Sequence, residues 1–427
     1  MPEFDLLIIG THPHPVIGIA EGRIAALREG SAKETIRAEG RLVLPGVVDA
    51  HVHFNDPGRA DWEGWPTGSR AALAGGVTTV CDMPLNSTPP VVTAAAFDAK
   101  RAAGEAGSCC DFALWGGLVP GHLDDLEPLA ERGVMGFKAF MSGSGIDDFP
   151  KADLATLREG MKRAAALGLP VGVHAEFDET EPAGGTSVRE YLASRPIESE
   201  CAAIKAAIEI AGETKCALQV VHVSSAQGLA LIASARLRGV NVTAETCPHY
   251  LLLTGEDMER IGPAAKCAPP MRDAANRETL WRKLRAGDIQ TIGSDHSPSP
   301  WSMKLDPNFF KVWGGISSIQ HLLPLLLDAD LEPERVAVLT ATNPARRFRL
   351  PAKGEIAVGS DADLTLVETG VRDPITADSL FYHHRHSPYV GRTLSARVER
   401  TILRGQTAYL NGTIPANGPR GQLLKPL

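Results

Sequence analysis

Eight apolar, strand-like runs alternate with helix-like stretches through the middle of this chain, and this alternation limits the possible folds more than any other feature. The runs are GVVDAHVHF, GVTTVCDMP, CDFALWGGLVP, GVMGFKAFM, LPVGVHAE, ALQVVHVSS, VNVTAETCP and IQTIGSDHSP. Amphipathic stretches such as ADLATLREGMKRAAALG and IESECAAIKAAIEIAG lie between them. Eight such alternations predict an α/β fold, a (β/α)8 TIM barrel, over residues 49–345.

A doubly wound open sheet would also alternate strands and helices. Such a sheet usually binds a nucleotide through a glycine-rich loop that follows one of its strands. No loop of that kind follows any of the eight runs. The sequence therefore favours the barrel.

The two ends of the chain resemble each other and differ from its middle. Residues 1–48 contain FDLLIIG, VIGIAEGRIAALRE and RLVLPG, and residues 346–427 contain GEIAVGSDADLTLVE and SARVERTILRGQTAYLNG. These short β-like runs are separated by turn residues and hold no long helix. We therefore expect a (β/α)8 barrel of residues 49–345 and a small β-domain built from residues 1–48 and 346–427. The last ten residues, GPRGQLLKPL, are expected to form an extended tail.

The composition argues against several kinds of partner. The formal net charge is −8 and no long run of Lys or Arg occurs, so neither nucleic acid nor an anionic membrane is expected as a partner. No apolar run reaches ~18 residues and the N-terminus has no basic region, so we expect neither a membrane span nor a signal peptide. Seven scattered cysteines without CxxC spacing indicate reduced, packed thiols in a cytoplasmic protein.

Polar side chains stand at or near the ends of five of the eight runs. They are His51, His53, Lys138, His174, His222 and Asp295. Because the catalytic groups of a TIM barrel lie at the carboxyl ends of its strands, these six are expected to converge. Taken singly, each histidine is as readily explained by packing, and a buried lysine by a charged partner. Together the six favour a metal centre, in which one face of the first strand presents both histidines of the HxH pair.

Lys138 needs its own explanation, because an ammonium group beside divalent cations would be repelled. It lies in the apolar run GFKAFM, and a desolvated lysine loses its proton more easily and can then react with CO2. The product, N6-carboxylysine, has one oxygen for each of two metal ions. We therefore predict two divalent ions, with Zn best suited to the ligands and Mn, Co or Fe as alternatives. A hydroxide shared by the metals would attack the substrate, and Asp295 would carry its proton to a leaving nitrogen.

This set of residues resembles the binuclear amidohydrolase superfamily, whose cyclic amidases include dihydroorotase, hydantoinase and allantoinase. The resemblance covers nearly the whole chain, including a composite β-sandwich domain made from both termini. It implies a first metal held by His51, His53, Lys138 and Asp295, and a second metal held by Lys138, His174 and His222. It also implies a small cyclic amide as substrate and a homotetramer.

Short motifs narrow the choice within this branch. Dihydroorotases read HxHxR, in which the arginine binds a substrate carboxylate, whereas Asn55 holds the matching position here. Hydantoinases often carry a tyrosine in the loop after the lysine run, and MSGSGIDDFP has none. The segments DMPLNSTPP and SGIDDFP resemble the allantoinase family, which implies hydrolysis of the hydantoin ring amide of (S)-allantoin to allantoate in purine degradation. The alternatives are a hydantoinase or dihydropyrimidinase, a dihydroorotase, and a non-catalytic relative of the kind that has lost metal ligands.

Three residues in loops are candidates for substrate contacts: Asn86, Gly315 and Ser317. Backbone groups and small polar side chains suit the carbonyl and N–H groups of a hydantoin ring. Asn86 could instead stabilise a turn, and Ser317 could cap a helix. Arg272 and His249 also lie near strand-end loops, and the sequence assigns neither of them a role.

Overall fold

The barrel that the alternation predicts is confirmed, and all eight runs form its strands. The structure is a computed structural model that describes residues 2–178 and 185–427. The barrel strands are β6 (Val47–Val52), β7 (Val77–Asp82), β8 (Asp111–Leu114), β9 (Gly116–Gly117), β10 (Phe137–Phe140), β11 (Val171–His174), β12 (Leu218–Val220), β13 (Val242–Thr246) and β14 (Thr291–Ile292). The third run is split into β8 and β9 at Trp115.

The barrel closes between its first and last strands. Strands β6, β7 and β8 pair in parallel, and so do β9 to β14 in chain order. Val52 at the end of β6 then forms a parallel bridge to His296, just after β14. Every residue of β6 and β7 is buried, because a barrel strand is covered on one face by the other strands and on the opposite face by helices.

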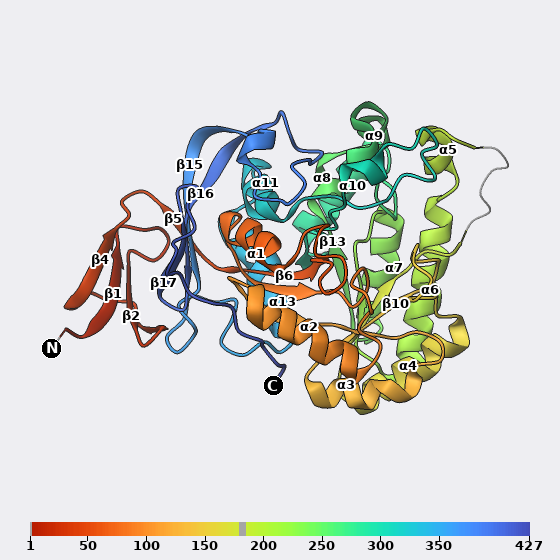
Figure 1. Cartoon of the computed structure of the whole chain (residues 1–427), viewed down its shortest axis with the longest axis horizontal. Helices are drawn as coiled ribbons and strands as arrows, with labels where there is room; N and C mark the ends of the chain where they lie inside the picture. Colours follow the sequence, from red (N-terminus) through yellow and green to blue (C-terminus); the bar gives the residue numbers. More distant parts are fainter. Residues whose placement is uncertain (1, 179–184) are drawn as a thin grey trace.

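Helices follow each strand and cover the outside of the barrel (Figure 1). They are α1 (Trp65–Ala74), α2 (Ala94–Gly107), α3 (Leu126–Arg132), α4 (Leu154–Ala166), α5 (Val188–Ala193), α6 (Ile197–Thr214), α7 (Ala226–Leu237), α8 (Pro248–Leu252), α9 (Gly255–Ile261), α10 (Ala274–Ala286), α11 (Leu322–Asp328), α12 (Pro333–Ala337) and α13 (Asn343–Arg347). Several begin at a side chain that accepts a hydrogen bond from the first turn, such as Thr93, Asp153 and Asp273. Such caps satisfy amides that a helix leaves unpaired at its start.

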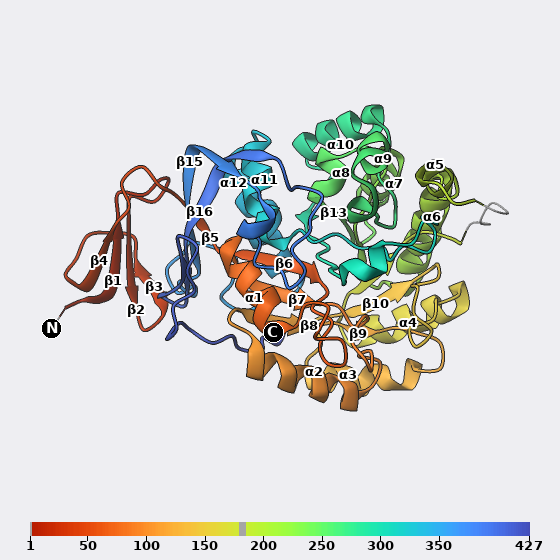
Figure 2. The ribbon, with the colours of Figure 1, turned by 45° about the horizontal axis from the view of Figure 1, so that its top comes forward.

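Two four-stranded sheets form the second domain, a β-sandwich built from both chain termini. Their strands are β1 (Phe4–Ile9), β2 (Val16–Ala20), β3 (Arg23–Ala26), β4 (Ala32–Arg37), β5 (Leu42–Pro45), β15 (Leu364–Pro374), β16 (Thr393–Leu403) and β17 (Gln406–Leu410). One sheet has the order β3-β2-β1-β4 and the other β17-β16-β15-β5, so an N-terminal strand completes the C-terminal sheet. Figures 1 and 2 show this second sheet between the first sheet and the barrel. The domain boundaries at residues 48 and 346 stay a prediction.

Strand β4 was not expected from the sequence. Its segment AKETIR is mostly polar, and only Ile36 in it is buried. The strand pairs in parallel with β1 at the edge of the sheet. A polar edge strand lacks the apolar pattern by which strands are recognised in a sequence.

Charged side chains join the barrel to the β-sandwich. The ammonium group of the buried Lys353 lies 2.6 Å from Asp111 of β8, 2.9 Å from Asp361 and 2.7 Å from Asp363, both of which lie just before β15. Arg404 also pairs with Asp111. The expected C-terminal tail lies beside the same strand, since Leu423 bridges in parallel to Phe112 of β8.

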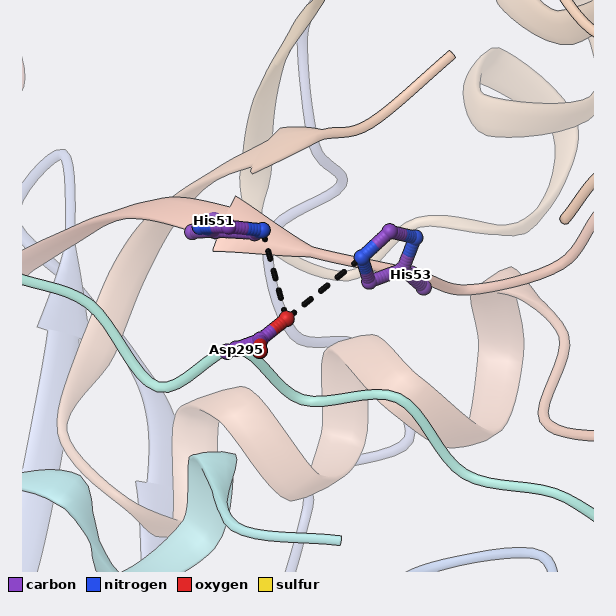
Figure 3. A group of neighbouring side chains, drawn as sticks. All are labelled: His51, His53 and Asp295. Carbon is purple, nitrogen blue, oxygen red and sulfur yellow. Dashed lines mark ion pairs between the residues drawn. The ribbon is translucent and has the colours of Figure 1, made fainter. Parts of the chain in front are cut away.

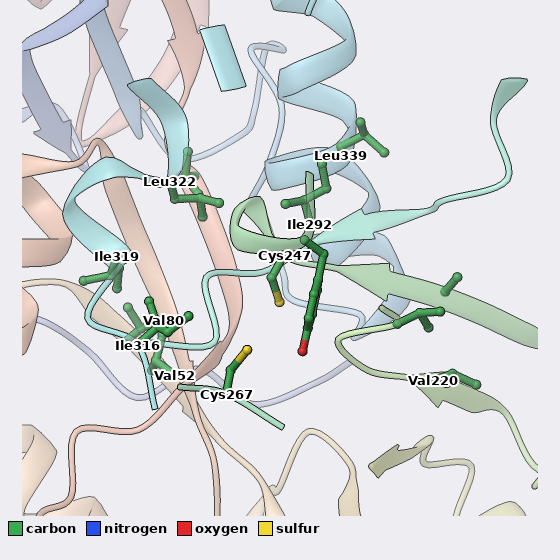
Figure 4. Close-up of a cluster of buried hydrophobic side chains, with 14 of the residues drawn as sticks. Val52, Val80, Val220, Cys247, Cys267, Ile292, Ile316, Ile319, Leu322 and Leu339 are labelled. Carbon is green, nitrogen blue, oxygen red and sulfur yellow. The ribbon is translucent and has the colours of Figure 1, made fainter. Parts of the chain in front are cut away.

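Apolar side chains pack around the barrel strands, as Figure 4 shows for Val52, Val80, Val220 and Ile292. Cys247 and Cys267 lie in the same cluster. All seven cysteines are free thiols, which agrees with packing as their function. In the part of the chain that the structure describes, no helix has both the length and the hydropathy needed to span a membrane.

Candidate metal centre

His51, His53 and Asp295 converge at the carboxyl ends of the first and last barrel strands (Figure 3). His51 belongs to β6, His53 follows it, and Asp295 follows β14. The Nε2 atoms of His51 and His53 lie 3.2 and 3.5 Å from the same oxygen of Asp295. One donor atom from each residue lies within 4.8 Å of the other two, and this is close enough for all three to bind one ion.

His174 and His222 form the neighbouring part of the site. His174 is the last residue of β11, and His222 lies two residues beyond β12. Nδ1 of His174 lies 3.0 Å from Nε2 of His222. The ring of His222 is also 5.4 Å, between centroids, from the ring of His51. The four histidines predicted from the sequence therefore line one continuous site.

Lys138 lies on β10 and is fully buried. Its side-chain nitrogen is 4.8 Å from the centre of the Phe140 ring, and it has no hydrogen-bond partner among the described residues. Burial lowers the pKa of Lys138 to about 7, although the carboxylates of Asp295 and Glu245 act in the opposite direction. A substantial fraction of this amine is therefore neutral near pH 7, and a neutral amine is the form that can add CO2.

Electrostatics around Asp295 and the histidines suits metal binding. Burial raises the pKa of Asp295, but His51, His53 and His222 outweigh that effect and hold the pKa well below its ordinary value. Burial lowers the pKa of His174 and His53, and burial together with Lys138 lowers that of His222. An ionised carboxylate and neutral imidazoles are the protonation states that bind divalent metals.

Two residues of the site have unusual backbone conformations. The φ angles of His222 and Asp295 are 40° and 47°, in the left-handed region that residues other than glycine rarely adopt. Such strain is tolerated where the surrounding structure determines the position of a functional side chain. Both residues follow a barrel strand, where this turn directs their side chains into the site.

The donor atoms fit the predicted pair of divalent ions. Nitrogen and oxygen ligands from histidine and carboxylate side chains suit Zn and similar metals. Lys138 Nζ and His222 Nδ1 are buried polar atoms without a partner among the described residues. A carboxylated Lys138 would supply anionic oxygen beside both groups of histidines. The assignment of all six residues as ligands stays a prediction.

Two glutamates that the sequence analysis did not single out contact these histidines. Oε1 of Glu245, on β13, lies 2.7 Å from Nδ1 of His51. Oε2 of Glu176 lies 3.4 Å from Nε2 of His174 and also pairs with Arg195. Each carboxylate can accept a hydrogen bond from the ring N–H that faces it, so that the lone pair of the other ring nitrogen faces the site and can bind metal. A glutamate at the end of an apolar run was the available signal, both in VTAET and in VHAE.

A cavity of about 530 Å³ opens above the histidines. This volume lies in the range that is usual for small-molecule sites. Of the predicted substrate contacts, Asn86 and Gly315 line the cavity, whereas Ser317 is not among the residues that line it. Asn86 has a φ of 68° and its amide nitrogen lies 3.4 Å from Nδ1 of His53. Their roles as substrate contacts stay predictions.

Three other polar residues that the sequence analysis considered lie in or near the site, and their contacts differ. Asn55 is buried, and its amide donates to the carbonyl oxygen of Pro298 over 3.3 Å. Arg272 donates to Ser224 Oγ over 2.9 Å and so braces a loop. His249 is buried beside Asp295, and neither of its ring nitrogens has a partner among the described residues.

A closed (β/α)8 barrel with this set of histidine, lysine and aspartate side chains at its strand ends is the architecture of the amidohydrolases. The sequence pattern of the amidohydrolase family matches residues 42–408, and the chain belongs to this family. Several curated relatives of the chain are named allantoinase. The allantoinase of Rubrobacter xylanophilus is 51% identical over 426 residues, covering 96% of this chain and 94% of that protein. The allantoinase of Deinococcus radiodurans is 50% identical over the same shares of both chains.

Solved structures of a hydantoinase and a dihydropyrimidinase have the same fold. The L-hydantoinase (dihydropyrimidinase) of Arthrobacter aurescens superposes with a TM-score of 0.94 at 33% identity, covering 99% of this chain and 100% of that one. The dihydropyrimidinase of Brevibacillus agri superposes with a TM-score of 0.89 at 28% identity. The shared fold extends over both domains.

Proposed function

We propose that this protein is a binuclear metal hydrolase that opens the hydantoin ring of (S)-allantoin to give allantoate. The similarity to allantoinases carries this proposal, because two of them are 50–51% identical to the chain over nearly its full length. The geometry is compatible with it, since a cavity of small-molecule size lies above four histidines and an aspartate.

The six residues at the strand ends would hold the two metal ions. His51, His53 and Asp295 would bind the first and His174 and His222 the second, with the carboxylated side chain of Lys138 shared between them. Zn suits these ligands best, and Mn, Co or Fe are the alternatives. When bound, the ions supply Lewis acidity, which lowers the pKa of water and polarises the amide carbonyl.

Asp295 would move the proton in this reaction. A new bond forms between the water oxygen and the ring carbonyl carbon, and the bond between that carbon and the ring nitrogen breaks. The carboxylate of Asp295, which stays ionised at neutral pH, accepts the proton of the attacking water and delivers it to the departing nitrogen. Glu245 and Glu176 would meanwhile keep His51 and His174 in one tautomer.

A hydantoinase or dihydropyrimidinase is the second candidate, and the superposition with the L-hydantoinase favours it. Dihydroorotase ranks lower, because the neutral Asn55 cannot replace an arginine that binds a carboxylate. We further propose that the chain acts in the cytoplasm as a homotetramer. Chromatography coupled to light scattering would test the assembly, and a dimer or monomer would contradict it.

An assay of three substrates, with metal analysis of the same preparation, tests the function. Allantoin, unsubstituted hydantoin and dihydroorotate would be compared by kcat/KM, and allantoin is expected to be the best of the three. A preference for hydantoin would replace this proposal by the second candidate. A preference for dihydroorotate would also refute the interpretation of Asn55, and an active protein without divalent metal would refute the mechanism.

A further inference from the structure

Two buried lysines outside the proposed ligand set bind main-chain carbonyl groups of one wall of the cavity. Lys266 follows a 3-10 turn after α9 and is 5% exposed, and Lys304 ends a short 3-10 helix and is 1% exposed. Burying a lysine amine is unfavourable unless acceptors surround it, and burial together with the nearby Lys266 lowers the pKa of Lys304 to about 7. What these two lysines bind is therefore informative.

Lys266 draws together three carbonyl groups of a single segment. Its side-chain nitrogen donates over 2.6, 3.0 and 2.6 Å to the carbonyl oxygens of Phe309, Phe310 and Val312. The same nitrogen lies 4.7 Å from the centre of the Tyr191 ring. Hydrogen bonds from a charged donor are stronger than neutral ones, so this lysine holds residues 309–312 firmly.

Lys304 holds the continuation of that segment. Its side-chain nitrogen donates over 2.9 and 2.8 Å to the carbonyl oxygens of Trp313 and Gly315. The amide of Gly315 in turn donates over 2.8 Å to the main-chain oxygen of Lys266. Both peptide groups of Gly315 are thus fixed, and the two lysines act on one continuous stretch, residues 309–315.

The space around the two glycines of this stretch differs. Gly315 has a φ of 134°, and a Cβ there would come within 2.2 Å of the carbonyl oxygen of Ser297. At Gly314, a Cβ would meet nothing within 4 Å. Both glycines line the cavity, together with Cys267. The wall is therefore packed tightly against Ser297, which also lines the cavity, and leaves open space beside Gly314.

We infer that Lys266 and Lys304 are positioning residues that fix the wall of residues 309–315 and thereby set the discrimination between substrates. The open space beside Gly314 suits a substituent on a hydantoin ring better than it suits a bare ring, which would leave the space unfilled. Without the lysines, five carbonyl groups would need other partners and the wall would move. The choice of substrates in this inference depends on the proposed function, whereas the order of the wall does not.

Lys304→Met and Lys266→Met keep most of the side-chain volume and remove the donors. Lys283→Met is the matched control, because Lys283 lies on α10 and pairs with Asp288 away from the cavity. We expect the KM for allantoin to rise roughly tenfold in each lysine variant, while kcat and metal content change little. The KM for unsubstituted hydantoin should rise less. A changed ratio of the KM for allantoin to the KM for hydantoin therefore distinguishes a loss of positioning from a general loss of structure, which would affect both substrates equally.

Hydrogen exchange measured by mass spectrometry reports how well ordered the wall is, and it needs no substrate. Peptides covering residues 309–315 should exchange faster in both variants, whereas the barrel strands should not. The double variant should exceed each single one by less than the sum of their effects, because both lysines act on one segment. If Lys304→Met does not fold, Lys304→Gln, which retains an amide donor, takes its place.

Unchanged exchange and an unchanged ratio of KM values in folded variants would overturn the inference. A wild-type protein that does not hydrolyse allantoin would instead refute the proposed function. In that case, the exchange experiment still decides whether the two lysines order the wall.

Discussion

Nδ1 of His51 lies 2.7 Å from Oε1 of Glu245, and both side chains are 1% exposed. An ionised carboxylate can only accept a hydrogen bond, so this contact favours the tautomer of His51 that has its proton on Nδ1, and Nε2 faces Asp295. The two residues lie 194 positions apart in the chain, on the first and the penultimate barrel strands, β6 and β13.

Glu245→Gln should weaken metal binding because the amide cannot orient or polarise the imidazole of His51 as a carboxylate does. We expect the metal dissociation constant to rise by about 10–100-fold, with the fold retained. Competition with a chelator, followed by metal analysis, measures it. Glu213→Gln, on the exposed side of α6, is the control. Equal affinities in the two variants would contradict the role of Glu245.

Lys138→Ala should lose the bridging anion and, with it, activity. The loss in kcat/KM is expected to be on the order of 10³-fold or more, about 4 kcal/mol of transition-state stabilisation. Adding acetate or formate should restore part of the activity, because a small carboxylate can enter the space that the side chain leaves. Lys162→Ala, on the exposed face of α4, is expected to be neutral. A Lys138→Ala protein with full activity and full metal content would show that no carboxylated lysine is needed.

Lys353→Met should destabilise the junction between the barrel and the β-sandwich. It would leave Asp111, Asp361 and Asp363 close together without their shared cation. Breaking a buried ion pair by removing one partner typically costs about 3–5 kcal/mol. Urea unfolding of the metal-free protein measures the change. Arg158→Met breaks an exposed pair with Glu213 and should cost less than about 1 kcal/mol. Similar losses of unfolding free energy in both variants would show that the buried cluster stabilises the protein no more than the exposed pair does.

His321→Gln should remove part of the acid sensitivity of the fold. Burial lowers the pKa of His321 from 6.5 to about 4. The unfolded chain therefore binds a proton at this residue before the folded chain does, so stability is full above pH ~6.5 and falls as the pH drops towards 4. The loss amounts to about 3 kcal/mol in total, since each pKa unit corresponds to about 1.4 kcal/mol.

The comparison of unfolding free energies at several pH values checks this prediction. The metal-free wild type and His321→Gln share the titration of the metal-site histidines, so that contribution cancels in their difference. We expect the wild type to lose more stability than the variant between pH 6.5 and 4. Parallel curves would show that His321 is protonated as readily in the folded state as in the unfolded state.

Much of the fold and the six predicted ligands could be read from the chain because both depend on local patterns. The apolar runs that form β6 and β7 are continuous since both faces of those strands are buried. His51, His174 and Asp295 follow or end such runs, and barrel topology brings all strand ends to one face. Strand β4 was missed because its exposed, polar segment lacks that pattern.

The sequence by itself determined the alternation of barrel strands and helices, the residues available for metal binding, and the presence of asparagine, not arginine, at position 55. Only the tertiary structure decided that Glu245 meets His51, that Glu176 meets His174, and that Lys266 and Lys304 gather the carbonyl groups of residues 309–315. Glu245 and His51 are 194 positions apart and meet only because the barrel closes. Glu176 lies two residues after His174, so strand alternation places them together, but only the tertiary structure shows that their side chains are in contact. The lysine contacts depend on how the loops fold over one another, which no local periodicity encodes.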